Sequence, residues 1–179
     1  MKSNPHKSRS VSFQSKITKI KLVLTDCDGV LTDTGVYYSN RGEVMKRFSI
    51  RDGMGVVRLR KLVGIETGIV TGELSGSVKK RAEKLKIKEL HLGTKDKVLI
   101  LNEIIKRKNL KAENISFIGD DLNDLEIMKL VGLTACPSDA IDEIKNISDF
   151  VCTNRGGHGA FREFAELIIN WHLKNKIIL

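Results

Sequence analysis

Two aspartates separated by one residue follow a short apolar run near the start of the chain. Residues 20–25 are mostly apolar and β-branched, which predicts a buried strand, and Asp26 and Asp28 come directly after it. Side chains alternate along a strand, so the two carboxylates point the same way, and their repulsion must be offset by a cation or a shared proton. Gly29 lets the backbone turn close to a ligand. This stretch indicates a metal site and two-acid chemistry, although Asp-x-Asp-Gly also occurs in ordinary turns.

Other polar residues follow the predicted strands 65–70 and 115–118, or begin the predicted helix 95–108. In chain order they are Thr71, Gly72, Lys97, Asp120, Asp121 and Asp124. Ligands of open α/β sheets bind at the carboxyl ends of strands, so we expect these residues to lie in one crevice. Carboxylates suit Mg²⁺, a hard cation that keeps waters and binds phosphate oxygens. The ammonium, the hydroxyl and the nearby amides suit a phosphoryl group.

The elements that must position these residues alternate between strand and helix. We predict further strands at 89–92, 133–136 and 150–152, and helices at 54–63, 75–86, up to 131, 140–147 and 160–173. Residues 36–48 read as a projecting β-hairpin and residues 51–53 as a loop. The alternation predicts an α/β fold with a doubly wound parallel sheet, and the spacing leaves no room for a cap domain.

Length and charge limit the alternatives. The 179 residues fit a single domain at 17–179, after a flexible basic leader at 1–16. Residues 1–21 hold six basic residues and no acid, which is most of the net charge of +9, so we expect no nucleic-acid partner. No apolar run is long enough for a membrane span, and no secretory signal is evident. Three widely spaced cysteines indicate reduced thiols in a cytoplasmic protein.

The ordered series Asp-x-Asp-Gly-Val, Thr-Gly, Lys and Gly-Asp-Asp-x-x-Asp resembles the four motifs of the haloacid dehalogenase-like phosphohydrolases. The resemblance covers about residues 20–170. It implies that Asp26 is the nucleophile, forming an aspartyl-phosphate, and that Asp28 is the general acid and base. It also implies that Thr71, Gly72 and Lys97 hold the phosphoryl group. Mg²⁺ would be bound by Asp26, by the Asp28 carbonyl and by Asp120, with Asp121 and Asp124 supporting the ligands.

Within that group the chain is similar to the capless sugar-acid phosphatases, which act on 3-deoxy-manno-octulosonate 8-phosphate or on nonulosonate 9-phosphates. The matching stretches are residues 26–33, 48–53, 119–124 and 155–163. The resemblance implies a Mg²⁺-dependent phosphomonoesterase of lipopolysaccharide or sialic acid biosynthesis. It also implies a homotetramer in which the hairpin packs on a neighbouring subunit.

The resemblance further implies contacts with the sugar acid. The expected substrate-binding residues are Arg51, Asp52, Gly53, Glu73, Arg81 and Lys84. Octulosonate enzymes typically have an arginine after Thr-Gly, whereas Glu73 with Arg81 and Lys84 resembles the nonulosonate type. Arg81 and Lys84 also fit an ordinary solvated helix face, since charged helix faces are common.

Three other functions remain open at this point. The chain could be a non-catalytic assembly module, related to domains fused to sugar-nucleotide synthetases, or a phosphatase of another small phosphorylated metabolite. It could also be a phospho-acceptor receiver, but the order of its acidic motifs fits that class poorly. An intact set of acids, threonine and lysine argues against a dead site.

Overall fold

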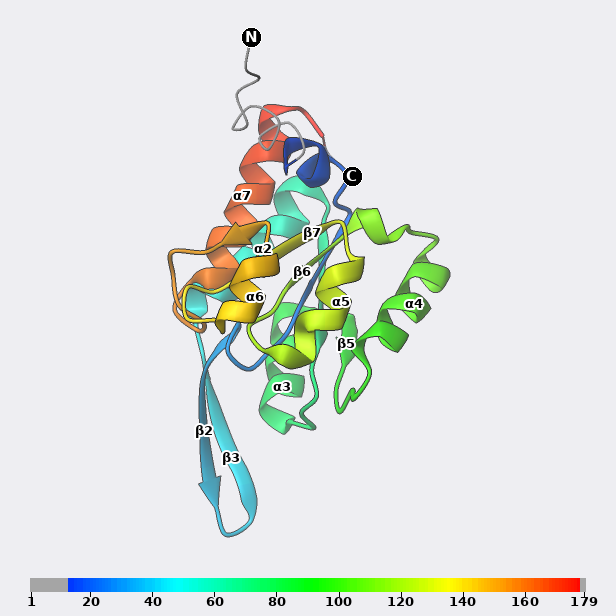
Figure 1. Ribbon diagram of the computed structural model, residues 1–179. Helices are drawn as coiled ribbons and strands as arrows, with labels where there is room; N and C mark the ends of the chain where they lie inside the picture. Colours follow the sequence, from blue (N-terminus) through cyan, green and yellow to red (C-terminus); the bar gives the residue numbers. More distant parts are fainter. Residues whose placement is uncertain (1–12, 178–179) are drawn as a thin grey trace.

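A six-stranded parallel sheet forms the centre of the computed structural model, which describes residues 13–177 (Figure 1). The strand order is β5-β4-β1-β6-β7-β8. Their bounds are β1 Leu22–Thr25, β4 Glu66–Val70, β5 Glu89–His91, β6 Ile115–Ile118, β7 Leu133–Cys136 and β8 Phe150–Val151. β1 lies between β4 and β6 in parallel register, and the predicted α/β fold is confirmed.

Helices cover both faces of this sheet, as a parallel sheet requires. They are α2 Ile50–Val63, α3 Gly76–Leu85, α4 Lys97–Lys108, α5 Leu125–Leu130, α6 Asp142–Ile147 and α7 Ala160–Lys174. Alternation along β1 divides the core, because Val23 packs with α2, α3 and α7, whereas Leu22 and Leu24 pack with α4, α5 and α6. Two short 3₁₀ turns, η1 Ala112–Asn114 and η2 Leu122–Asp124, flank β6.

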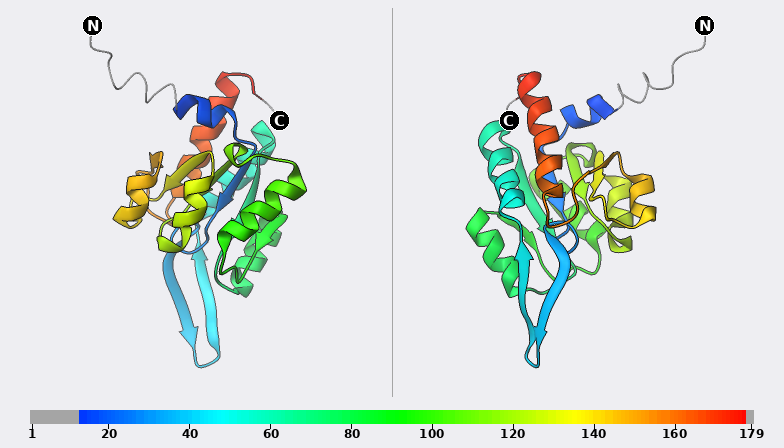
Figure 2. Two further views of the ribbon diagram at one scale, coloured as in Figure 1. Left: turned by 45° about the vertical axis from the view of Figure 1, so that its right-hand side comes forward. Right: turned by 90° about the vertical axis from the view of Figure 1, so that its left-hand side faces the viewer.

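The predicted hairpin projects from the sheet as a separate two-stranded ribbon (Figures 1 and 2). β2 runs over Thr32–Ser39 and pairs antiparallel with β3 at Gly42–Phe48. Much of its apolar surface is exposed, including Tyr37, Tyr38 and Met45. The described chain contains no inserted cap domain between the hairpin and α7.

The expected loop at residues 51–53 is wrong, because these residues form the first turn of α2. Ser49 caps the helix by accepting a hydrogen bond from the Asp52 backbone amide. Gly53 sits where an added Cβ would lie 2.4 Å from the Arg81 guanidinium, so its small size serves packing inside a helix. The sequence Arg-Asp-Gly is typical of a turn, because glycine is a poor helix former.

The expected leader lies mostly outside the described residues. The part of it that is described, residues 13–16, forms the start of a short helix over 13–18. The Nζ of Lys16 lies 2.6 Å from Oδ1 of Asp149. Residues 13–16, which were expected to be flexible, are therefore helical. Within the described part of the chain, no helix has the length and apolar character needed to cross a bilayer.

Candidate active site

The sequence-predicted acids meet at the carboxyl end of β1, where the strand order reverses. The chain goes from β1 to β4 and β5 on one side, and from β6 to β7 and β8 on the other. A cavity of about 280 Å³ opens there. Its lining includes Asp26, Asp28, Thr71, Gly72, Glu73, Asp120 and Asp121, from the segments after β1, β4 and β6. A crevice at this point of an open α/β sheet is the usual ligand site. The structure therefore brings together residues separated by almost a hundred positions.

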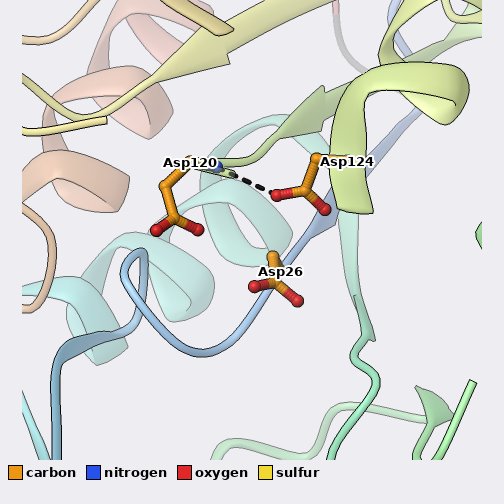
Figure 3. A group of neighbouring side chains, drawn as sticks. All are labelled: Asp26, Asp120 and Asp124. Carbon is orange, nitrogen blue, oxygen red and sulfur yellow. Dashed lines mark hydrogen bonds between the residues drawn. The ribbon is translucent and has the colours of Figure 1, made fainter. Parts of the chain in front are cut away.

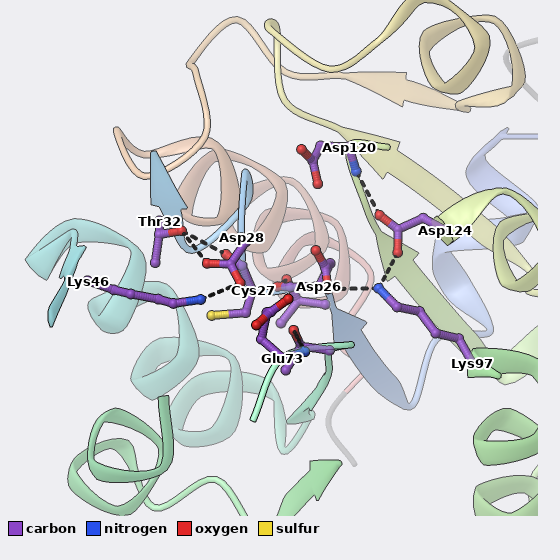
Figure 4. Close-up of polar contacts among 11 residues, drawn as sticks. Asp26, Cys27, Asp28, Thr32, Lys46, Glu73, Lys97, Asp120 and Asp124 are labelled. Carbon is purple, nitrogen blue, oxygen red and sulfur yellow. Dashed lines mark hydrogen bonds and ion pairs between the residues drawn. The ribbon is translucent and has the colours of Figure 1, made fainter. Parts of the chain in front are cut away.

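Lys97 sits at the floor of this cluster, at the start of α4. It is only 4% exposed, and its Nζ lies 2.7 Å from Asp26 Oδ1 and 2.6 Å from Asp124 Oδ1 (Figure 4). Burial lowers the pKa of Lys97, but the two carboxylates raise it above its usual value, so the ammonium is retained. The buried lysine thus holds the Asp26 carboxylate in a fixed orientation.

Asp124 is fully buried and uses both carboxylate oxygens within the protein. One binds Lys97, and the other accepts a hydrogen bond of 2.9 Å from the Asp120 backbone amide. An added Cβ on Gly119 would lie 2.4 Å from Asp124, so only glycine fits between them. These contacts agree with the supporting role expected for Asp124. Asp121, by contrast, is exposed and caps η2.

The acid cluster has the composition of a site for a hard divalent cation. Oxygens of Asp26, Asp120 and Asp124 lie within 4.8 Å of one another (Figure 3). Asp120 Oδ1 is buried and has no hydrogen-bond partner among the described residues, which is costly unless a ligand satisfies it. Burial, with the neighbouring carboxylates, raises the pKa of Asp120 to about 8, and burial and Asp124 raise that of Asp26 to about 7. A bound Mg²⁺ would satisfy the unpartnered oxygen and neutralise the repulsion between the buried carboxylates.

Thr71 and Gly72 follow β4 beside the acids. Thr71 is 1% exposed, and its hydroxyl accepts a hydrogen bond from the Glu73 backbone amide, which tightens the turn. Its own backbone is tied to the next loop, since its carbonyl accepts from Thr94 N. Thr71, Gly72 and Glu73 line the cavity, so this turn offers hydroxyl and amide groups at its wall.

The Asp28 side chain points away from the cluster of Asp26, Asp120 and Asp124 and toward the hairpin. Its Oδ2 lies 2.6 Å from Lys46 Nζ and its Oδ1 accepts a hydrogen bond of 3.1 Å from Thr32 (Figure 4). This direction is compatible with a metal contact through the Asp28 carbonyl and not through its carboxylate. Sequence reasoning missed Lys46. The available signal was alternation, because Lys46 shares the inward face of β3 with Phe48.

Five of the six predicted sugar-acid contacts do not line the cavity. Glu73 does, as an exposed side chain at its rim, whereas Arg51, Asp52, Gly53, Arg81 and Lys84 do not. Asp52 is wrong as a direct contact, because it is buried and its carboxylate accepts hydrogen bonds from the Gly159 and Arg162 amides of α7. Gly53 is buried in α2.

Arg81 binds within the chain, whereas Arg51 and Lys84 are exposed. The Arg81 guanidinium donates to the Ser49 carbonyl at 2.8 Å and lies over the Phe48 ring, so it stabilises the join between hairpin and α2. Arg51 and Lys84 are exposed on α2 and α3. In a single chain these residues do not reach the cavity, and their substrate role stays a prediction that would require a neighbouring subunit.

The fold and the cluster define a haloacid dehalogenase-like hydrolase. The family model of that description matches residues 84–163, the part of the chain that carries Lys97, Asp120 and Asp124.

Several relatives in sequence and in structure belong to one narrower group of enzymes. The chain is 35% identical over 165 residues to a 3-deoxy-D-manno-octulosonate 8-phosphate phosphatase of Haemophilus influenzae, covering 92% of this chain and 91% of that protein. The same enzyme from Yersinia pestis has a crystal structure with a TM-score of 0.86 and 32% identity, covering 92% and 89%. That from Moraxella catarrhalis, solved with magnesium, phosphate and the sugar acid, gives 0.85 and 33%, covering 92% and 95%. This chain belongs to their family and is a phosphoric monoester hydrolase.

The raised pKa values predict how pH and Mg²⁺ act on stability. The folded metal-free protein keeps protons on Asp26 and Asp120 that the unfolded chain releases near its ordinary pKa of 3.8. Stability from these groups is therefore lost as pH rises toward about 7 and about 8. Mg²⁺ binds the ionised carboxylates. We therefore expect Mg²⁺ to raise the Tm of the protein by more at pH 8 than at pH 6.

Thermal unfolding with and without Mg²⁺ at the two pH values measures this difference in Tm. The Asp120→Ala variant should lose most of the Mg²⁺ effect, and an equal Mg²⁺ shift at both pH values would contradict the prediction.

Proposed function

We propose that the chain is a Mg²⁺-dependent phosphatase of a phosphorylated 2-keto-3-deoxy sugar acid. The observation that supports this most is the pairing of Asp26 with the buried Lys97 at an open cavity. Beside them lies Asp120, whose buried Oδ1 has no hydrogen-bond partner in the part of the chain that the structure describes. The sugar-acid substrate is taken from the relatives, which are phosphatases of 3-deoxy-D-manno-octulosonate 8-phosphate.

The first half-reaction assigns one task to each residue. An Asp26 carboxylate oxygen attacks phosphorus, the bond from phosphorus to the sugar oxygen breaks, and the protonated Asp28 gives its proton to that oxygen. Thr71 and Lys97 hold the phosphoryl oxygens. When Mg²⁺ is bound by Asp26, Asp120 and the Asp28 carbonyl, it screens the repulsion between carboxylate and phosphate.

The second half-reaction returns the enzyme to its starting state. Asp28, now ionised, takes a proton from water, whose oxygen attacks the phosphorus of the aspartyl-phosphate. The bond between phosphorus and the Asp26 oxygen breaks, which releases inorganic phosphate and restores the carboxylate. Asp28 regains its proton and is ready for the next cycle.

Two sugar acids are candidates. The relatives favour 3-deoxy-D-manno-octulosonate 8-phosphate. Glu73 at the cavity rim, where octulosonate enzymes typically carry arginine, supports a nonulosonate 9-phosphate as the second candidate. Values of kcat/KM for both, with an aryl phosphate as a generic substrate, test the function. A non-catalytic assembly module would show no sustained Mg²⁺-dependent turnover of any of them.

Glu73 gives a prediction about selectivity. Replacing it with arginine in Glu73→Arg removes an acceptor for sugar hydroxyls and adds a partner for the sugar carboxylate. We expect the ratio of kcat/KM for the nonulosonate to that for the octulosonate to fall by about tenfold or more, since one lost hydrogen bond is worth roughly 1–3 kcal/mol. Assaying both substrates on both proteins gives the ratio, and Glu103→Arg, at an exposed position of α4, is the control. A change of less than about twofold would remove Glu73 as the selector.

The hairpin supports the proposal of a homotetramer. Val36, Tyr37, Tyr38, Val44 and Met45 are all exposed on it, and apolar surface of this kind is usually covered in an assembly. Four subunits is the number that the resemblance supplies. We expect light scattering to give the tetramer mass at micromolar concentration, and a Tyr38→Lys variant to shift toward smaller species. A stable wild-type monomer would contradict this assembly.

The cysteines support a cytoplasmic location. Cys27, Cys136 and Cys152 are free and buried, and burial raises the pKa of each thiol. Thiols of this kind are inert and need no oxidising compartment.

A further inference from the structure

The two arms of the hairpin hold both oxygens of the Asp28 carboxylate. Thr32 at the start of β2 donates to Oδ1 at 3.1 Å, and Lys46 of β3 donates to Oδ2 at 2.6 Å (Figure 4). Because both oxygens are fixed, the carboxyl group cannot rotate freely about its last bond. The hairpin therefore acts on a proposed catalytic residue of its own chain.

Lys46 is buried although the hairpin around it is open. Its side chain is 1% exposed, whereas its neighbours Met45 and Arg47 are exposed. Burying an ammonium is costly unless anions compensate for it. Asp28 and the more distant Glu43, at 3.6 Å, supply that compensation.

A further contact joins this group to the start of α3. The Ser75 hydroxyl donates to Glu43, and Ser75 is also the residue that caps α3, four positions after Thr71. Asp28, Lys46, Glu43 and Ser75 thus form a continuous chain of polar contacts. These contacts run from the proposed general acid to the N-cap residue of α3, four positions beyond Thr71.

We propose that Lys46 is a positioning residue that orients the Asp28 carboxyl group toward the leaving oxygen of the substrate. This inference rests on the proposed phosphatase function. In the step concerned, the bond from phosphorus to the leaving oxygen breaks and the Asp28 proton moves to that oxygen. Lys46 neither gives nor receives a proton in this step. Of the proposed reacting groups, Asp28 is the one that it contacts.

The dependence of rate on the leaving group tests this role. A leaving group with a high pKa needs a proton in the transition state, whereas 4-nitrophenolate leaves without one. We expect Lys46→Met to lower kcat/KM for a simple alkyl phosphate by about a hundredfold, within the range attributed to general acids. The loss for 4-nitrophenyl phosphate should be under about fivefold, so that log kcat/KM falls more steeply with leaving-group pKa.

Two variants and a control accompany this experiment. Lys46→Arg keeps a cation beside Asp28 and should recover much of the alkyl phosphate activity. Thr32→Val removes the contact at Oδ1 only, and should change the same leaving-group dependence if Lys46→Met fails to fold. Arg41→Met removes an exposed charge at the hairpin turn and should leave the dependence unchanged.

Three outcomes are distinguishable. No Mg²⁺-dependent turnover by the wild-type protein would overturn the proposed function itself. An active wild type with equal losses for alkyl and aryl phosphates in Lys46→Met would overturn the positioning role, since it would indicate that Lys46 binds the phosphoryl group. An unchanged leaving-group dependence in the folded variants would overturn it as well.

Discussion

Replacing Asp26 with asparagine should lower turnover of a phosphate monoester by at least about a thousandfold. The amide keeps the shape of the side chain but cannot attack phosphorus, and covalent catalysis has no substitute nucleophile. Substrate binding should persist, because Thr71 and Lys97 remain in place. The measurement is kcat with saturating Mg²⁺, with the substrate Kd determined separately by calorimetry on the inactive variant.

The same variant tests the covalent intermediate. Acid-quenched wild-type protein should carry a phosphoryl group on the peptide that contains Asp26, and Asp26→Asn should not. Asp142→Asn is a matched control, because the Asp142 side chain is 91% exposed on α6 and does not line the cavity. Activity of Asp26→Asn within tenfold of wild type would rule out Asp26 as the nucleophile.

Lys97→Met should have the second largest effect, on stability as well as on activity. The substitution leaves Asp26 and Asp124 buried next to each other with no cation between them. Removing one partner from a buried ion pair typically costs about 3–5 kcal/mol, because the remaining charge is uncompensated. We expect urea unfolding to show a loss of this order. The loss should be greater at pH 8 than at pH 6, because burial and Asp124 raise the pKa of Asp26 to about 7 and its carboxylate is charged only above that pH.

Mg²⁺ should partly restore the stability of Lys97→Met, since a divalent cation also neutralises the acid pair. The control is Lys95→Met, which removes an exposed lysine two positions earlier. That variant should unfold within about 0.5 kcal/mol of wild type, as surface substitutions usually do. If Lys97→Met were as stable as Lys95→Met, the buried pair could not be what holds Asp26 in place.

The sequence alone determined the sheet and most of its polar edge. Apolar runs of four to six residues, each followed by acids, a threonine or a glycine, predicted β1, β4 and β6 and their parallel arrangement. The periodicity of residues 95–108 predicted α4 and placed Lys97 at its first turn. Asp26, Thr71, Lys97 and Asp120 could be assigned to one crevice because the topology of alternating strands and helices leaves a single edge for them.

Only the tertiary structure decided what surrounds those residues. Lys46 reads as one more charge on an exposed hairpin. Alternation along β3 places it on the same face as Phe48, but only the folded chain shows that its ammonium lies against Asp28. Asp52 reads as a loop carboxylate, yet it is buried in α2 as a partner of the α7 amides more than a hundred residues away. Local pattern reports the period and the ends of an element, whereas burial and ion pairing depend on contacts between distant segments, which only the folded chain brings together.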